Sequence, residues 1–206
     1  RLSHTYHTCF IANLRLVLDV EVQPGNKSAS KHSSPGLWEL LGRIPRAHWP
    51  AFIRGDRDWG TEPNMARAEQ EGVEYLFKLR LTAKVKKLIE RLMRGASWTA
   101  AGQGWQGAEA PLRLSGWSRA RRAVVLRRRI NKDLAVVDPS NPEQLRLSFA
   151  ELTDEAIVYE YAVLVTSLTE EIHGVAQLYR DRADCENPFD ELKNHWGWGG
   201  FTTRDL

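Results

Sequence analysis

The sequence has few cysteines and no long apolar run, and each shortage argues against a class of protein. Cys9 and Cys185 are the only cysteines among 206 residues, and they are far apart and at no metal-ligand spacing. This argues against a disulfide framework and favours a reduced, cytoplasmic setting. No segment approaches the ~20 apolar residues of a membrane span, and no signal peptide is visible, so no membrane partner is expected. The six histidines also lack the spacing typical of metal ligands.

The remaining composition is that of an ordinary soluble globular protein, with 42% hydrophobic and 27% charged residues. A chain of this length can bury one sizeable core, or a core with a substantial insertion. The formal net charge of +3 and the isoelectric point near 9.0 permit a polyanionic partner without requiring one.

Hydrophobic periodicity and helix caps predict alternating strands and helices between residues 4 and 95. The stretch from Val73 to Leu81 alternates apolar and charged side chains, with Leu76 as the one exception, and is typical of a half-buried strand. In chain order, the pattern predicts two strands within 4–22 closed by a turn at Pro24–Gly25, a helix from Ser34 to Ile44, a strand over 50–56, a helix from Thr61 to Gly72, the strand over 73–81, and a helix from Thr82 to Gly95 with Val85, Leu88, Ile89 and Leu92 on its apolar face. This order indicates a mixed α/β layer structure.

The composition changes at Ala96, where a stretch rich in Gly, Ala and Gln begins. Strands are predicted at 112–117, 123–130 and 145–150, and a return strand within 155–168. We therefore expect a first part of an α/β core over 1–95, a β-rich insertion over 96–154, and a second part of the core over 155–206.

Four side chains near the C-terminus share one face of a predicted helix. Tyr179, Arg182, Glu186 and Lys193 lie within about 60° of one another at 3.6 residues per turn. A carboxylate flanked by cations suits a group that holds a divalent metal while its neighbours bind phosphates. The alternative is a solvated helix with an Arg182–Glu186 pair worth a few tenths of a kcal/mol. Pro188 should kink this helix, which weakens the geometric argument most for Lys193.

The pattern Tyr-x2-Arg-x3-Glu-x6-Lys that these residues form resembles the signature of a large group of bacterial insertion-sequence transposases. The resemblance implies an RNase H-like core with a metal triad of two Asp and one Glu, and a β-rich insertion between the second and third acids. It also implies that Glu186 is the third acid, and that Tyr179, Arg182 and Lys193 contact DNA near the cleaved phosphate.

Asp56 matches the second acid of this family. It follows a predicted strand, the usual place for functional residues on an open α/β sheet, and it precedes the turn Arg57–Gly60. Asp58 is a competing candidate, and the structural alternative for Asp56 is a turn residue that bonds its own backbone. With Glu186, Asp56 would hold two Mg²⁺ or Mn²⁺ ions roughly 3.5–4 Å apart for phosphodiester cleavage.

The first acid of the family lies upstream of a segment similar to the opening residues of this chain. We therefore expect the sequence to be an internal fragment that lacks this acid and is inactive alone. Asp19 lies on a predicted strand, but its alternation with apolar neighbours fits a solvent-facing position.

A basic segment carries seven cations between Arg119 and Lys132. Its arginines are candidate DNA contacts, whose affinity would fall with salt and carry no sequence specificity. The alternative is a basic hairpin edge that discourages aggregation. Trp98, Trp105 and Trp117 could stack on an unpaired base, although packing is the commoner role of such residues. The candidate DNA-binding arginines are Arg119, Arg121, Arg122, Arg127, Arg128 and Arg129.

The sequence as a whole predicts a transposase catalytic domain that cleaves DNA strands at transposon ends and transfers them to target DNA. Its partner would be double-stranded DNA, and a homodimer is expected in the synaptic complex. One alternative is a non-catalytic DNA-binding remnant or domesticated transposase, in which mutation of Glu186 would change nothing. Another is a related RNase H-like nuclease, which would yield nicks without strand-transfer products.

Overall fold

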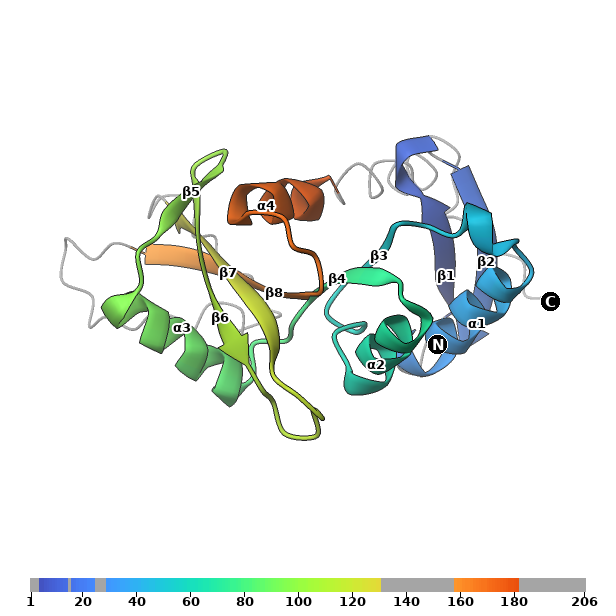
Figure 1. Ribbon diagram of the computed structural model, residues 1–206, viewed down its shortest axis with the longest axis horizontal. Helices are drawn as coiled ribbons and strands as arrows, with labels where there is room; N and C mark the ends of the chain where they lie inside the picture. The colour runs from blue at the N-terminus through green and yellow to red at the C-terminus, as the bar shows by residue number, and fades with distance from the viewer. Residues whose placement is uncertain (1–3, 15, 25–28, 131–157, 182–206) are drawn as a thin grey trace. The chain divides into compact units, whose positions relative to one another are not determined.

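The computed structural model describes residues 4–14, 16–24, 29–130 and 158–181. The chain divides into two compact units, one of residues 1–54 with 177–206 and one of residues 55–176 (Figure 1). No helix in the described ranges is long and apolar enough to cross a membrane.

In the first unit, two antiparallel strands, β1 (His4–Ile11) and β2 (Leu16–Pro24), are joined by a 3₁₀ turn at Ala12–Leu14. This confirms the two strands expected from the β-branched N-terminal segment. The register shifts between Cys9 and Phe10, where a bulge interrupts the ladder.

Helix α1 (Ala29–Gly42) follows, and then the short strand β3 (Phe52–Gly55). The expected start of α1 at Ser34 is wrong, because the helix begins at Ala29 and Pro35 lies in its interior. A proline there removes one helical hydrogen bond, to the carbonyl of Lys31, and the helix extends across this defect. The strand expected over 50–56 is confirmed, and Asp56 is the first residue after it.

The second unit holds helices α2 (Glu62–Glu71) and α3 (Ala83–Gly95) and the start of α4 (Ile172–Arg180). Its strands are β4 (Glu74–Lys78), β5 (Thr99–Gly102), β6 (Trp105–Leu112), β7 (Arg121–Ile130) and β8 (Val158–Thr166). The hydrogen-bonded order is β3-β4-β8-β7-β6-β5, and every neighbouring pair from β4 to β5 is antiparallel. The return strand predicted within 155–168 is therefore β8, inserted between β4 and β7.

Helices α2 and α3 begin and end close to where their caps predict. Thr61 precedes α2, and Gly72 ends it with a φ of 64°, a left-handed conformation that favours glycine. Thr82 precedes α3, whose buried residues are the predicted stripe of Val85, Leu88, Ile89 and Leu92.

The core of the second unit lies on the central strands of the sheet. Tyr75, Leu76 and Phe77 are each at most 1% exposed, so the middle of β4 is buried on both faces instead of the expected one. Strands β7 and β8 contribute the adjoining runs of buried residues, which are Ala123, Val124, Val125, Leu126, Ala162, Val163, Leu164 and Val165.

Two expectations for the β-rich segment need correction. The strand predicted at 112–117 is wrong, because β6 ends at Leu112 and the Trp117 N–H closes a turn onto the Leu114 carbonyl at 3.1 Å. The hairpin of β5 and β6 was not predicted, because small residues have little intrinsic strand preference. It turns at 102–104, where all three residues have positive φ. The strand expected at 145–150 lies outside the described residues.

Helices α3 and α4 cover opposite faces of this sheet. Tyr161 of β8, whose hydroxyl contacts the Met93 sulfur of α3, is paired with Arg127 of β7. Gly107 of β6 is paired with the next residue, Leu126, and approaches Ile172 of α4. Because successive strand residues point to opposite faces, the two helices are separated by the sheet.

We predict that Gly107→Ala lowers the free energy of unfolding by about 2 kcal/mol. A Cβ atom at Gly107 would overlap Ile172 Cγ2 and lie 3.2 Å from Leu126 Cδ2, so the helix or the strand must shift. Urea denaturation would measure the loss. The matched control is Gly95→Ala at the end of α3, where an added Cβ meets no atom within 4 Å; an equal loss there would contradict the steric explanation.

Candidate functional site

Asp56 starts a tight turn between β3 and α2. Its Oδ1 accepts a hydrogen bond from the Asp58 N–H at 3.0 Å, and its carbonyl accepts one from the Trp59 N–H at 3.0 Å. Asp56 thus bonds the backbone of its own turn, which is the structural alternative considered for this residue. It is also exposed, and Oδ2 has no hydrogen-bond or ion-pair partner in the described part of the chain. The carboxylate can both close the turn and present an oxygen to a hard cation such as Mg²⁺.

Close packing fixes the backbone of this turn. A Cβ atom on Gly55 would lie 2.5 Å from Trp59 Cβ, and one on Gly60 would lie 2.9 Å from the Lys78 carbonyl oxygen. Both positions therefore require glycine. The Trp59 ring packs against Phe77 with centroids 6.1 Å apart, which joins the turn to the buried middle of β4.

Asp58, the competing acid, has a different environment. Its Oδ1 pairs with the Arg80 guanidinium, and its side chain is 23% exposed. A carboxylate already neutralised by a guanidinium is a weaker candidate for a metal ligand than an exposed carboxylate with a free oxygen.

Of the four residues on the C-terminal ridge, only Tyr179 falls in the described part of the chain. It lies in the last turn of α4 and is half-buried. Arg182, Glu186 and Lys193 lie outside the described residues. Within the described ranges no three His, Cys, Asp or Glu side chains cluster at metal-binding distances. Asp19 is exposed on β2 as expected, but its apolar neighbours Leu18 and Val20 are also exposed, so the alternation of burial on which the expectation rested is absent.

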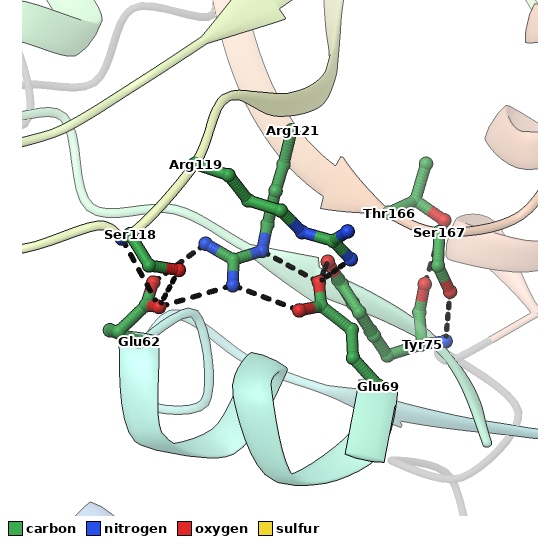
Figure 2. Close-up of polar contacts among 8 residues, drawn as sticks. All are labelled: Glu62, Glu69, Tyr75, Ser118, Arg119, Arg121, Thr166 and Ser167. Carbon is green, nitrogen blue, oxygen red and sulfur yellow. Dashed lines mark hydrogen bonds and ion pairs between the residues drawn. The ribbon is translucent and has the colours of Figure 1, made fainter. Parts of the chain in front are cut away.

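The basic segment begins with an arginine that is buried. The Arg121 side chain is 3% exposed and contacts two carboxylates of α2, as Figure 2 shows. Its Nη1 and Nη2 donate to Glu62 at 2.6 and 3.2 Å, and its Nε and Nη2 donate to Glu69 at 2.7 and 3.0 Å. Ser118 adds an N–H and a hydroxyl donor to Glu62. The geometry gives Arg121 a structural role that the sequence did not reveal.

Glu69 also receives hydrogen bonds from other parts of the unit. The Tyr75 hydroxyl donates at 2.8 Å, and an Arg119 nitrogen lies 2.9 Å away (Figure 2). Burial alone would raise the pKa of Glu69, but the hydrogen bonds from Arg121, Arg119 and Tyr75 outweigh it and hold the pKa at about 2. The Arg121 hydrogen bonds likewise lower the pKa of Glu62. Burial and the bond to Glu69 raise the pKa of Tyr75.

The other arginines of this segment lie nearer the surface. Arg122 pairs with Glu109 and donates to the Leu168 carbonyl at 2.7 Å, and Arg128 pairs with Glu160.

Arg127 is stacked on aromatic rings, 3.9 Å from the centroid of Trp98 and 4.7 Å from that of Tyr159. Arg129 is exposed, and no partner for it is found in the described ranges. The three arginines at the end of β7 thus keep exposed or stacked guanidinium groups near the surface.

A family model for the transposase DDE domain matches residues 1–206. The chain belongs to this transposase family. The resemblance inferred from Tyr179, Arg182, Glu186 and Lys193 is therefore confirmed at the level of the family. No curated protein matches the chain. The α/β fold class is confirmed, and the six-stranded sheet with its helices agrees with the RNase H-like core of this family.

The low pKa of Glu69 predicts that the transposase loses stability in acid. A carboxylate with a folded pKa of about 2 and an ordinary pKa of 4.5 stabilises the fold above pH 4.5, and the contribution disappears as the pH falls toward 2. Glu69→Gln should lower the free energy of unfolding by about 3 kcal/mol at pH 7, with a gap to the wild type that narrows below pH 4.5. Urea denaturation between pH 7 and 2.5 measures this gap.

The control is Glu71→Gln, which removes a solvent-exposed i,i+4 pair with Arg67 on the same helix. Such pairs contribute a few tenths of a kcal/mol, so this variant should follow the wild type at every pH. A gap for Glu69→Gln that does not change with pH would contradict the linkage.

Proposed function

We propose that the domain catalyses metal-dependent cleavage of DNA strands at the ends of a bacterial insertion sequence and their transfer to target DNA. The observation that carries this proposal is the family match over the whole chain, joined to an exposed Asp56 on a fixed turn directly after β3. The partners would be double-stranded DNA at the transposon ends and at the target, with a homodimer in the synaptic complex.

In this proposal Asp56 and Glu186 each offer carboxylate oxygens to two Mg²⁺ or Mn²⁺ ions. When bound, such ions supply an activated nucleophile and stabilise the leaving oxygen. The free Oδ2 of Asp56 fits a hard cation, and the ion pair of Asp58 with Arg80 favours Asp56 over its neighbour. Arg182 and Lys193 would bind the phosphates around the cleaved bond.

Tyr179 would position the scissile strand. Tyr179 lies in the last turn of α4, which ends at Arg180. The family's first acid has no assigned counterpart in this sequence. We accordingly propose that these 206 residues alone do not cut DNA.

The basic surface proposed to contact DNA lies at the far end of β7 from Arg121. Arg127 and Arg129 occupy one face of the strand and Arg128 the other. Exposed Arg119 could add a phosphate contact, and so could half-buried Arg122. The buried contacts of Arg121 give no support for a DNA contact by this residue.

The first test is DNA cleavage by the protein together with a segment that supplies the family's first acid. Asp56→Asn and Glu186→Gln should each lower the rate of Mg²⁺-dependent nicking of transposon-end DNA by a factor of about 10³ or more, because each removes a metal ligand. Strand-transfer products, assayed in the same reactions, separate a transposase from a nuclease. Asp58→Asn is the matched control, since its carboxylate already pairs with Arg80. Loss with Asp58→Asn but not with Asp56→Asn would exchange the two assignments, and nicking retained in both acid variants would remove Asp56 and Glu186 from the site. Absence of nicking by the unsubstituted protein would favour the non-catalytic alternative.

A second test concerns the end of β7. Arg129→Gln should weaken binding to DNA of any sequence and reduce the slope of log K against log salt by about 1, because one phosphate contact is lost. Fluorescence anisotropy of labelled duplex at several salt concentrations measures the slope. Arg67→Gln removes an exposed arginine of α2 and should leave the slope unchanged. Equal slopes for Arg129→Gln and the wild type would remove Arg129 from the proposed surface.

A further inference from the structure

One guanidinium group holds both ends of α2. Glu62 is the first residue of this helix and Glu69 lies in its last turn, and both pair with Arg121 at 2.6–2.7 Å. The two carboxylate groups are 22% and 18% exposed, so the network is largely shielded from water. Helix α2 is short and spans only Glu62–Glu71. Pairing at both ends therefore fixes its position and its tilt against β7.

The other side of α2 holds the turn that carries Asp56. Asn64, which is 3% exposed, donates from its side-chain amide to the Trp59 carbonyl at 3.1 Å. The Met65 N–H bonds the Thr61 carbonyl at 3.1 Å, and the Thr61 N–H bonds the Trp59 carbonyl at 2.7 Å. The Trp59 carbonyl therefore accepts two bonds at the N-terminus of the helix, so a displacement of α2 is transmitted directly to the turn.

We propose that Arg121 is a positioning residue for the Asp56 carboxylate, acting through α2. The inference rests on the proposed function of Asp56 as a metal ligand. An arginine supplied by the β-rich segment, which makes no contact with Asp56, would then control how accurately this acid is held. Metal-dependent sites tolerate displacements of only about 0.5 Å, so a small tilt of α2 matters.

A tilt is the expected result of losing this arginine. Without Arg121, Glu62 and Glu69 would face each other across a poorly solvated site with only Ser118, Arg119 and Tyr75 as partners. Two carboxylates left without their shared cation repel each other and seek water, which draws the helix away from the strand.

The experiment uses the complete 206-residue chain and measures amide hydrogen exchange by NMR. Arg121→Met should speed exchange of the Trp59 and Met65 amides about tenfold, while amides in the middle of β8 exchange at the wild-type rate. Arg121→Lys, which keeps the charge and is expected to keep the fold, should give a smaller change in the same direction. Arg67→Met, which breaks the exposed pair with Glu71 on α2, is the control and should change neither group.

Two further variants separate the ends of the helix. Glu62→Gln weakens the contact next to the turn, and Glu69→Gln weakens the distant one. Faster exchange at Trp59 in Glu62→Gln than in Glu69→Gln supports the proposal. Faster exchange everywhere in Arg121→Met, or nowhere, would show that Arg121 contributes general stability or nothing to the turn, and would overturn it.

Paramagnetic broadening by Mn²⁺ connects the turn to the metal. In the wild type, Mn²⁺ should selectively broaden the amide signals of residues 56–59, and Arg121→Met should need a severalfold higher Mn²⁺ concentration for the same effect. If the wild-type signals do not broaden, the metal-binding role of Asp56 fails and the positioning role fails with it. If they broaden equally in Arg121→Met and exchange is unchanged, only the positioning role fails.

Discussion

The placement of α2 in the second unit depends on the pairing of one buried charge. Arg121 is 3% exposed, and a guanidinium cannot lose its proton to escape an apolar site, so it must be matched by carboxylates. Glu62 and Glu69 supply that match from a single helix. Any arrangement that moves α2 away from the start of β7 leaves three charges unpaired in a poorly solvated space. The network therefore favours one packing of α2 against β7, whether or not the ion pairs add net stability to the fold.

The pairing of Arg121 with α2 also connects the β-rich segment of the transposase to the rest of the second unit. Strand β7 belongs to the β-rich segment, yet it pairs with β8, and β8 pairs with β4. The described part of that segment, residues 96–130, thus shares a sheet and a core with β4 instead of forming a separate body. Arg121 of this segment pairs with α2, the helix that follows the Asp56 turn. The domain boundaries expected at 96 and 154 stay a prediction, but the sheet gives a physical route by which the segment can affect the acid.

Local signals explain which parts of the fold could be predicted. Thr61, Gly72 and the apolar stripe of α3 act within a few residues, and the elements they predict are present. Strands β5 and β6 could not be found in this way, because their Ala and Gly residues become strand through pairing, β5 with β6 and β6 with β7. The placement of Asp56 directly after β3 was predicted correctly, since an apolar run followed by a turn is also a local signal. Its role in metal binding stays a prediction.

Charged residues are harder to interpret, because their chemistry depends on distant neighbours. Arg121 and Arg127 lie on the same face of β7, yet one is buried against α2 and the other stacks on Trp98 and Tyr159. Nothing in the segment from Arg119 to Lys132 distinguishes them, because the α2 carboxylates that pair with Arg121 come from a distant part of the sequence.

The two acids of the turn follow the same rule. Asp56 and Asp58 are two residues apart in one turn. Arg80, beyond the end of β4, pairs with Asp58, whereas Asp56 uses Oδ1 for the turn and keeps Oδ2 available. A sequence motif specifies a type of residue. When two residues of that type lie close together, the packing around them determines which one can bind a metal ion.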